Sequence, residues 1–372
     1  MMEYDIESVA SNFRLEGRLI EAEPFGSGYI NDTFSLRCRT DAGERHYILQ
    51  RINHHVFKDP AAMMDNIRRV TTHIRRKLQG QGDKSAERQL TVIETNDGAA
   101  CFEDNQGNYW RLYNKIEDAL TYDTLESAEM AYEVARMFGW FQRMLTDLPG
   151  PPLNETIRNF HTTPKRLRDF QEVHQRDPCN RAKDAGAEID FVLENAGICD
   201  VLLNLVGEGK IPVRIAHNDA KTNNVMLDAG THKGVCVIDL DTVMPGLSLY
   251  DFGDMVRTAT SPAEEDERDL SKVAMQMSRF EMLAKGYAEE THTFLTSAEK
   301  KHLAFSGKLI TFEQMIRFLA DHLAGDIYYK VHREGHNLDR SRTQMKLVES
   351  IVEQQEAMNE VVERVFRQIE VS

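Results

Sequence analysis

The sequence predicts an α+β fold of two lobes, a small sheet-rich lobe over residues 1–117 and a larger, mainly helical lobe over residues 118–372. Two observations predict it. Short strand-like runs separated by turn residues fill the first part, whereas long stretches of helical periodicity fill the second. A chain of 372 residues is long enough for two such lobes with a well-sized core.

The elements of the first lobe follow from alternating apolar residues and turn signals. Strand-like runs stand at 18–25, 32–39, 45–52, 89–95 and 109–116. A helix is expected from Pro60 to residue 79, because Met63, Ile67, Val70 and Ile74 recur at helical spacing. We interpret the basic residues of this helix as a solvated face; they are Arg68, Arg69, Arg75 and Arg76.

The second lobe begins after a short connector near residues 114–118. Helical periodicity runs through 127–145, 187–206, 307–331 and the last thirty residues. Embedded between these helices, residues 213–240 are typical of a strand, a polar loop and a second strand. This embedded segment contains the pattern that predicts chemistry.

The pattern begins with His217, followed two residues later by Asp219 and then by Asn224. Phosphoryl transfer needs a carboxylate that orients the attacking hydroxyl and accepts its proton, and hard oxygen ligands that hold Mg²⁺ against the nucleotide phosphates. Asp219 fits the role of catalytic base, and Asn224 fits that of a metal ligand. The apolar run "VCVI" then delivers Asp239, the second predicted metal ligand, with Asp241 as a candidate to assist it.

Residues 251–253 spell DFG, the metal-binding triplet of protein kinases. Asp251, however, follows a Pro-Gly turn rather than a strand, and Asp239 already stands where the metal ligand is needed. We therefore expect Asp251 to support the catalytic loop from the start of a helix.

The residues that bind the nucleotide phosphates are expected in a glycine-containing turn, Gly26, Ser27 and Gly28, where backbone N–H groups can approach phosphates closely. A plain hairpin turn would have the same composition. The next strand, "HYILQRIN", lacks the lysine that protein kinases place there, and Arg51 is the candidate to replace it. The connector "LYNKIED" would supply backbone hydrogen bonds to adenine.

The strings "HNDAKTNNVMLD", "VIDLDTVMPG" and "DFGDMVR" resemble the phosphotransferase family that includes aminoglycoside phosphotransferases and choline kinases. More closely, "YILQR", "EDERDL", "RFLADHLAGDIYY" and "HNLDRSRTQMKLV" are similar to the N-acetylhexosamine 1-kinases, over most of the chain. The resemblance implies a protein-kinase-like fold and the transfer of phosphate from ATP, with Mg²⁺, to the anomeric hydroxyl of N-acetylglucosamine or N-acetylgalactosamine.

The resemblance also implies the sugar site. Arg317 and Tyr328 would contact the sugar, and Asp321 shares a helix face with Arg317, so this pair could bind sugar hydroxyls or form a surface ion pair. Tyr29 stands where the subfamily has a histidine, and Thr258 where it has an aromatic ring. We expect Tyr29 to lie near the sugar, and these departures bear on which hexosamine is preferred.

Charge and cysteine content bear on which ligands the protein binds and in which compartment it works. A formal charge of −15 excludes general nucleic-acid binding, which needs a basic face, but it suits a second hypothesis, a kinase of the same fold acting on a cationic alcohol such as choline or an aminoglycoside. A nucleotide-binding scaffold without activity is the third. Five scattered cysteines without a CxxC pair predict a reduced compartment, the cytoplasm, and no apolar run predicts a membrane span.

Overall fold

The computed structural model describes residues 4–26 and 31–371, and the chain divides into two units. Unit 1 comprises Met1–Ala119, Asp147–Arg158 and Val235–Met244, and unit 2 comprises Leu120–Thr146, Asn159–Gly234 and Pro245–Ser372. Unit 1 therefore takes in two later segments, one of which contains Asp239 and Asp241. The fold is mixed helix and sheet, with strands gathered in unit 1 and helices in unit 2, as the sequence predicts.

The sheet of unit 1 is antiparallel, with the strand order β1-β2-β3-β6-β4 and β5 beside β6. Its strands are β1 (Arg18–Pro24), β2 (Asp32–Thr40), β3 (Gly43–Ile52), β4 (Val92–Ile93), β5 (Phe102–Glu103) and β6 (Tyr109–Asn114). Four of the five predicted runs form strands. The run at 89–95 shortens to two paired residues, because the Thr91 N–H bonds to the Asn114 side chain and the Thr95 N–H to the Ala99 carbonyl.

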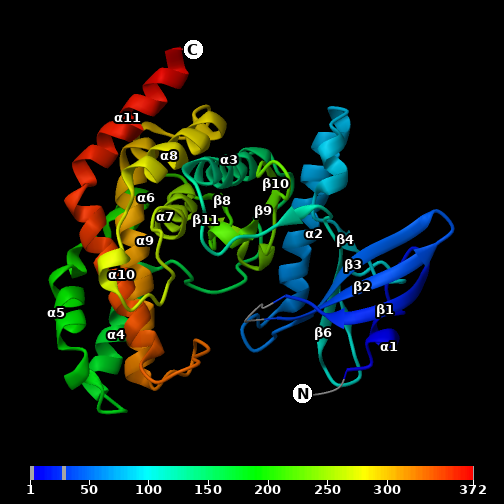
Figure 1. Ribbon diagram of the computed structural model, residues 1–372, viewed down its shortest axis with the longest axis horizontal. Helices are drawn as coiled ribbons and strands as arrows, with labels where there is room; N and C mark the ends of the chain where they lie inside the picture. Colours follow the sequence, from blue (N-terminus) through cyan, green and yellow to red (C-terminus); the bar gives the residue numbers. More distant parts are fainter. Residues whose placement is uncertain (1–3, 27–30, 372) are drawn as a thin grey trace. The chain divides into compact units, whose positions relative to one another are not determined.

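Helix α2 (Pro60–Gly80) forms where the sequence predicts a helix. The Asp59 carboxylate caps its N-terminus by accepting from the Ala62 N–H, and proline at the first position needs no hydrogen bond. Its apolar face is buried, and Asn66 on the same helix donates to the backbone oxygens of Asn154 and Val243. In Figure 1 α2 lies beside β4, and the short helix α1 (Ile6–Ala10) packs near β1.

Unit 2 is built around α9, which contacts α4, α7, α10 and α11. Its helices are α3 (Ala128–Met144), α4 (Thr163–Arg176), α5 (Gly186–Glu194), α6 (Val201–Gly207), α7 (Ser248–Ala259), α8 (Met277–Thr291), α9 (Ser297–Ala324), α10 (His336–Glu353) and α11 (Gln355–Val371). Phe312, Met315 and Ile316 on α9 are buried in its core. A capping box between Thr296 and Glu299 fixes the start of α9.

Three predicted helical stretches are interrupted in the structure. The stretch 187–206 divides into α5 and α6, where the Asn195 side chain donates to the Phe191 carbonyl. The last thirty residues divide at Gln354. The stretch 307–331 ends early, because Gly325 adopts a left-handed φ of 103° and stops α9.

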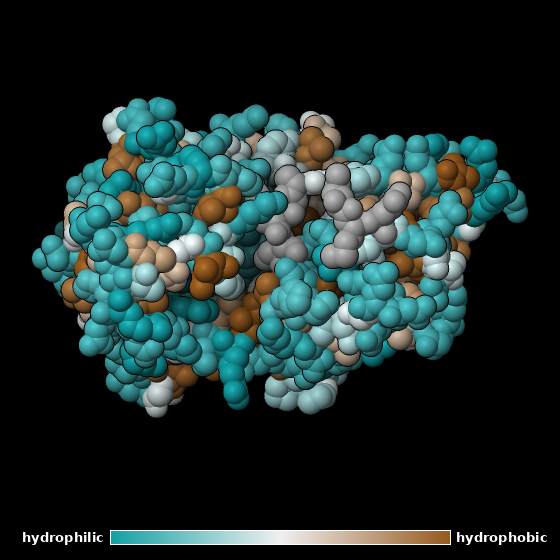
Figure 2. Space-filling model, turned by 90° about the horizontal axis from the view of Figure 1, so that it is seen from below, coloured by the Kyte–Doolittle hydropathy of each residue, from teal (hydrophilic) through white to brown (hydrophobic). Residues whose placement is uncertain are grey.

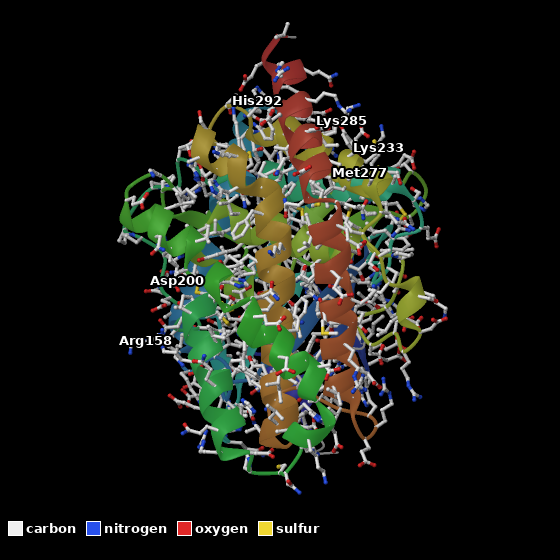
Figure 3. All side chains as sticks on the ribbon, turned by 90° about the vertical axis from the view of Figure 1, so that its left-hand side faces the viewer. Arg158, Asp200, Lys233, Met277, Lys285 and His292 are labelled. Carbon is white, nitrogen blue, oxygen red and sulfur yellow. The ribbon has the colours of Figure 1, made fainter. Side chains whose placement is uncertain are left out.

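Short strands also occur outside the sheet of unit 1: β7 (Ala119–Leu120), β8 (Arg214–Ala216), β9 (Val225–Asp228), β10 (Gly234–Val237) and β11 (Met244–Gly246). The face shown in Figure 2 is mostly hydrophilic, with scattered hydrophobic residues. Figure 3 shows Lys285 of α8, and His292 just after that helix, on the side of unit 2 where α8 contacts α11. No helix within residues 4–26 and 31–371 is long and apolar enough to cross a membrane, and the five cysteines are free.

Candidate active site

The predicted polar loop follows β8 and ends in a short 3-10 turn, Thr222–Asn224, before β9. Asn218 adopts a left-handed φ of 63°, which asparagine tolerates better than most residues, and its side chain donates to the Ala216 carbonyl. Gly246 approaches so closely that a Cβ atom there would lie 2.3 Å from Asn218 Oδ1. Glycine at 246 therefore leaves room for the turn that presents Asp219.

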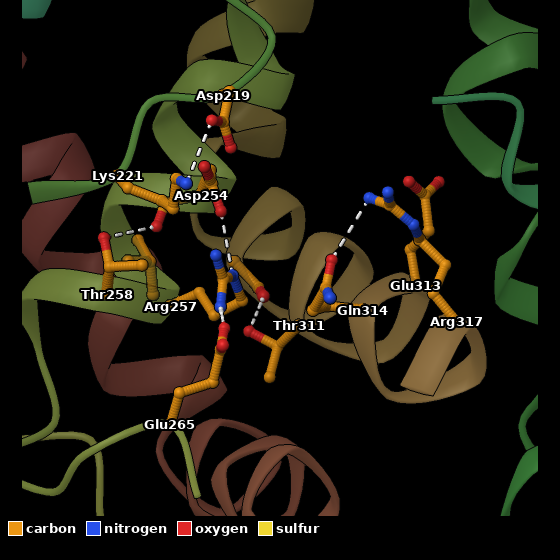
Figure 4. A network of polar contacts seen from close by, with 12 residues as sticks. Asp219, Lys221, Asp254, Arg257, Thr258, Glu265, Thr311, Glu313, Gln314 and Arg317 are labelled. Atoms are coloured by element: carbon orange, nitrogen blue, oxygen red, sulfur yellow. Dashed lines mark hydrogen bonds and ion pairs between the residues drawn. The ribbon is translucent and has the colours of Figure 1, made fainter. Parts of the chain in front are cut away.

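Asp219 lies at the surface of this loop, with 28% of its side chain exposed and an ion pair of 3.1 Å to Lys221 Nζ (Figure 4). Burial among its neighbours raises the pKa of Asp219, but the Lys221 ammonium, together with the neighbouring His217 ring, outweighs it and holds the pKa below its ordinary value. The carboxylate is therefore ionised at neutral pH. It can accept a hydrogen bond from an incoming hydroxyl and orient it.

Asp251 supports this loop from the first turn of α7, as predicted. Its Oδ2 accepts the His217 N–H at 2.9 Å and the Gln142 side chain at 2.6 Å, and its Oδ1 accepts the Asn218 N–H at 2.7 Å. Burial raises the pKa of Asp251, although these hydrogen bonds oppose the rise. Two consecutive backbone groups just before Asp219 are thus fixed by one buried carboxylate.

The other two residues of the DFG triplet have packing roles. Phe252 is fully buried and contacts the rings of Phe280 and Tyr287. Gly253 lies where α7 crosses α9, and a Cβ atom there would come within 2.4 Å of the Ser306 carbonyl oxygen. The triplet therefore serves the interior of unit 2.

A second buried group holds the loop from the other side, and the sequence analysis did not find it. His161 Nε2 lies 2.7 Å from the Asn218 carbonyl oxygen and Nδ1 lies 2.8 Å from Glu313, which also accepts from Thr163. Burial lowers the pKa of His161, but the Glu313 carboxylate has the larger effect, so the pKa of His161 is raised. Burial likewise raises the pKa of Glu313, but His161 has the larger effect, so the pKa of Glu313 is lowered. The pair is charged near pH 6, and no local sequence pattern connects residues 152 positions apart.

Arg317 lies on the face of α9 that also carries Glu313 (Figure 4). It donates to Gln314 Oε1 at 3.2 Å and stacks over the rings of Phe160 and Tyr329. Its pKa is lowered by burial but raised more by the groups around it, Asp219 among them. The ion pair with Asp321 that its spacing allowed does not form.

Arg166 on α4 is a second cation close to Arg317, and the sequence analysis did not single it out. Its guanidinium donates to the Phe160 carbonyl at 2.9 Å. Burial, and then the positive charge of Arg317, lower the pKa of Arg166. Within the described parts of the chain, neither arginine forms an ion pair with a carboxylate.

The loop after α9 carries Tyr328, whose side chain is 59% exposed. The carboxylate of Asp321 accepts the N–H groups of Ile327, Tyr328 and Tyr329 at 2.8–3.0 Å. It also accepts from Asn337 at 2.8 Å. In the structure Asp321 shapes the loop that presents Tyr328, and a direct contact between Asp321 and a substrate stays a prediction.

The comparison with known families decides the class of protein. The sequence pattern of the phosphotransferase enzyme family matches residues 21–276, more than half of the chain. The chain belongs to this phosphotransferase family. It is therefore a phosphotransferase that acts on an alcohol acceptor, with ATP and Mg²⁺ as its cofactors.

Solved structures share the phosphotransferase's fold at low sequence identity. Spectinomycin phosphotransferase aligns with a TM-score of 0.53 at 12% identity, covering 91% of this chain and 94% of that one. An aminoglycoside phosphotransferase from Alicyclobacillus acidocaldarius aligns at 0.51 and 14%, covering 100% and 98%. Choline kinase from Cryptosporidium parvum aligns at 0.51 and 14%, covering 92% and 91%. These likenesses confirm the kinase-like fold.

The predicted metal ligands of this phosphotransferase fit a hard cation. Asn224 donates through its amide nitrogen to the carbonyl and carboxylate oxygens of Asp219, at 2.8 and 3.2 Å, so its amide oxygen is the atom left to bind Mg²⁺. Asp239 follows β10 in a left-handed conformation, with φ of 57°. Among the described residues no three His, Cys, Asp or Glu side chains form a metal cluster, and the roles of Asn224 and Asp239 as metal ligands stay predictions.

Asp241, the candidate to assist Asp239, is engaged elsewhere in unit 1. It forms a buried ion pair with Arg111 of β6 and accepts from Asn31 at 3.0 Å, while Arg111 also donates to Gln50 Oε1 at 2.9 Å. The sheet pairs Gln50 with Arg111, which puts both on one face. Arg111 is thus the cation beside the segment that carries the acids.

Arg51 follows Gln50 in β3 and therefore points to the opposite face of the sheet. There it forms an ion pair of 2.7 Å with Asp32 and lies over the ring of Tyr4. Its role as a nucleotide ligand stays a prediction. Gly26 has a left-handed φ of 74°, as a tight glycine turn requires, whereas Ser27, Gly28 and Tyr29 lie outside the described residues.

Proposed function

We propose that the protein phosphorylates the anomeric hydroxyl of an N-acetylhexosamine, N-acetylglucosamine or N-acetylgalactosamine, to the 1-phosphate in the cytoplasm. In this proposal Asp219 orients the hydroxyl and accepts its proton, and Asn224 and Asp239 hold Mg²⁺ on the nucleotide phosphates. Mg²⁺ would neutralise the charge that develops during transfer. A hemiacetal hydroxyl is more acidic than an ordinary alcohol, so one aligned carboxylate is enough for the proton.

The charge near Asp219 is the observation that carries the choice of acceptor. Arg317 and Arg166 lie in unit 2 without carboxylate partners among the described residues, and Glu313 is already paired with His161. A cationic alcohol needs acids or an aromatic cage free of competing cations. Two guanidinium groups without a carboxylate ion pair instead favour an acceptor with carbonyl and hydroxyl oxygens, such as an N-acetylated sugar.

Aromatic side chains near these arginines support a sugar further. Tyr328 is exposed at the tip of its loop and packs edge-on against Tyr329, at 4.8 Å between ring centroids. An exposed ring combines an apolar face with a polar hydroxyl, which suits the mixed faces of a pyranose. Tyr328 and Arg317 are therefore the proposed sugar contacts.

The experiment is a panel of acceptors with purified protein, ATP and Mg²⁺. N-Acetylglucosamine, N-acetylgalactosamine, their non-acetylated parents, choline and an aminoglycoside are compared by ATP consumption, and phosphorus NMR then locates the phosphate. We expect an N-acetylhexosamine 1-phosphate. A 6-phosphate would refute the regiochemistry, and preferred consumption of choline or the aminoglycoside would refute the acceptor class.

The Asp219→Asn variant tests the assigned base. It removes the charge while keeping shape, so turnover is expected to fall at least a hundredfold with no change in fold. Asp190→Asn, at an exposed position of α5, is the matched control and should keep wild-type activity. Equal activity in both variants would remove Asp219 from the mechanism.

A further inference from the structure

Unit 1 contains a groove of about 440 Å³ that is lined by one side of α2, by β4 and by the segment before β1. Four arginines contribute to its lining: Arg14, Arg68, Arg75 and Arg76. Those on α2 belong to the face that the sequence predicts to be solvated, and Arg75 and Arg76 are indeed exposed. This solvated face forms part of one concave surface.

The spacing of the residues on α2 explains this arrangement. Positions 68, 72, 75, 76 and 79 recur every three or four residues, so they form one stripe along the helix. The buried stripe, which includes Met63, Ile67 and Val70, occupies another face. Thr72 and Gln79 therefore add hydroxyl and amide donors beside the guanidinium groups of Arg75 and Arg76.

The charges in the groove do not cancel. Arg14 forms an ion pair of 3.0 Å with Glu94, the one carboxylate residue in the lining, and Arg68 forms one of 3.1 Å with Asp65. Arg75 and Arg76 are exposed and form no ion pair with any residue that the structure describes. Two positive charges thus remain uncompensated in a chain whose formal charge is −15.

The opposite wall has a different character. Val92 and Ile93 of β4 are half-buried and supply apolar surface beside the basic stripe. Arginine groups bind phosphate oxygens in a bidentate manner, and a cavity of a few hundred Å³ accommodates a small molecule. The lining therefore suits a compact ligand with phosphate groups on one side and a carbon skeleton on the other.

We propose that this groove binds a small, multiply phosphorylated anion, at a place separate from the residues assigned to the nucleotide, the metal and the acceptor. Guanidinium groups of Arg75 and Arg76 would contact the phosphates, with Arg68 and Arg14 able to exchange their present carboxylate partners for the ligand. The two sources of such an anion, an inorganic polyphosphate and a sugar bisphosphate, share this chemistry and differ in whether they use the apolar wall.

Isothermal titration calorimetry on the full chain tests the proposal without relying on turnover. Saturating ADP, with no added metal, first fills the nucleotide site, and tripolyphosphate or glucose 1,6-bisphosphate is then titrated at constant ionic strength. The test variant is R75E/R76E, and the matched control is K58E/K84E, the same charge change at exposed positions of unit 1 outside the groove.

We expect saturable binding of one of these probes to wild type and to K58E/K84E with equal Kd, and binding at least tenfold weaker to R75E/R76E. ADP affinity should be equal in all three proteins, which places the second ligand elsewhere. Tighter binding of the bisphosphate would assign the sugar phosphate as the source, and tighter binding of tripolyphosphate the inorganic one. Absence of binding to wild type, an equal Kd for R75E/R76E, or an equal loss in both variants would overturn the site.

Discussion

Replacing Asp251 with asparagine separates the two roles that a DFG aspartate can have. In the structure its carboxylate accepts three hydrogen bonds, from the N–H groups of His217 and Asn218 and from Gln142. Asparagine keeps the shape but has one acceptor oxygen, so its amide group must face at least one of these donors. A buried donor left unpaired costs about 1–3 kcal/mol.

The buried charge itself offsets part of this cost, because the raised pKa of Asp251 shows that the fold disfavours its ionised form. We therefore expect Asp251→Asn to destabilise the protein by about 2 kcal/mol, or a fall in Tm of about 4–8 °C for a unit of this size. Because the same loop presents Asp219, kcat should fall about tenfold to a hundredfold.

The assay is thermal unfolding without Mg²⁺, followed by kcat as a function of Mg²⁺ concentration. Asp200→Asn is the matched control, since Asp200 is exposed at the surface (Figure 3) and its side chain makes no cap hydrogen bond to α6. If Asp251 supports the loop, the Asp251→Asn variant has a lower Tm in the absence of metal, and its Mg²⁺ requirement equals that of wild type. Unchanged Tm together with a raised Mg²⁺ requirement would show that Asp251 binds metal, and the reasoning from the strand before Asp239 would fail.

Three further predictions concern the interior of unit 2. Glu313→Gln breaks the buried pair with His161 and should cost about 3 kcal/mol between about pH 4.5 and 6.5. As the pH falls below this window it approaches the lowered pKa of Glu313, and as it rises above the window His161 loses its proton. Urea unfolding should therefore show a smaller loss of unfolding free energy in the variant on both sides of the window. A loss that does not change with pH would contradict the charge assignment. Gly253→Ala should cost about 1–3 kcal/mol through contact with α9, whereas Gly207→Ala, with open space around it, should be neutral or stabilising by up to about 1 kcal/mol; equal Tm values would refute the close packing. Gly246→Ala should lower kcat at least tenfold because it displaces the loop before Asp219, and wild-type kinetics would show that the loop has room to relax.

The elements that sequence reasoning located well have a local cause. The sheet strands alternate, and α2 has a capping aspartate followed by proline, so boundaries and faces follow from neighbouring residues. The predicted helix 307–331 ends earlier in the structure for a local and a non-local reason. Gly325 in a left-handed conformation is a local stop signal. The non-local part is Asn337, which donates to the same Asp321 carboxylate that accepts three N–H groups of the following loop.

The same distinction applies to the candidate site. Asp219, Asn224 and Asp239 stand in one segment, so their spacing predicts a shared chemistry. Asp251, which the sequence predicted as a support, holds the loop together with His161, and behind them stand Gln142 and Glu313; the last three residues come from distant helices or loops. The contact between Arg111 and Gln50 is equally non-local, because only the pairing of β3 with β6 brings these two residues together.

Net charge was the observation that most favoured a cationic acceptor, and the structure explains why it is a poor guide. A charge of −15 is a sum over a whole surface, most of which is solvated and screened within about 8–10 Å. An acceptor responds to the few groups that lie near Asp219, and Arg317 is one whose pKa already reflects the charge of that carboxylate. Arg166 lies close enough for its charge to interact with that of Arg317, and neither arginine forms an ion pair with a carboxylate among the described residues, so the charge of the whole chain does not describe this part of unit 2. Arg317→Glu should therefore weaken binding of a neutral sugar and leave choline turnover no higher than in wild type, because the remaining Arg166 still repels a cation. A gain in choline turnover in this variant would show that a single charge sets the specificity.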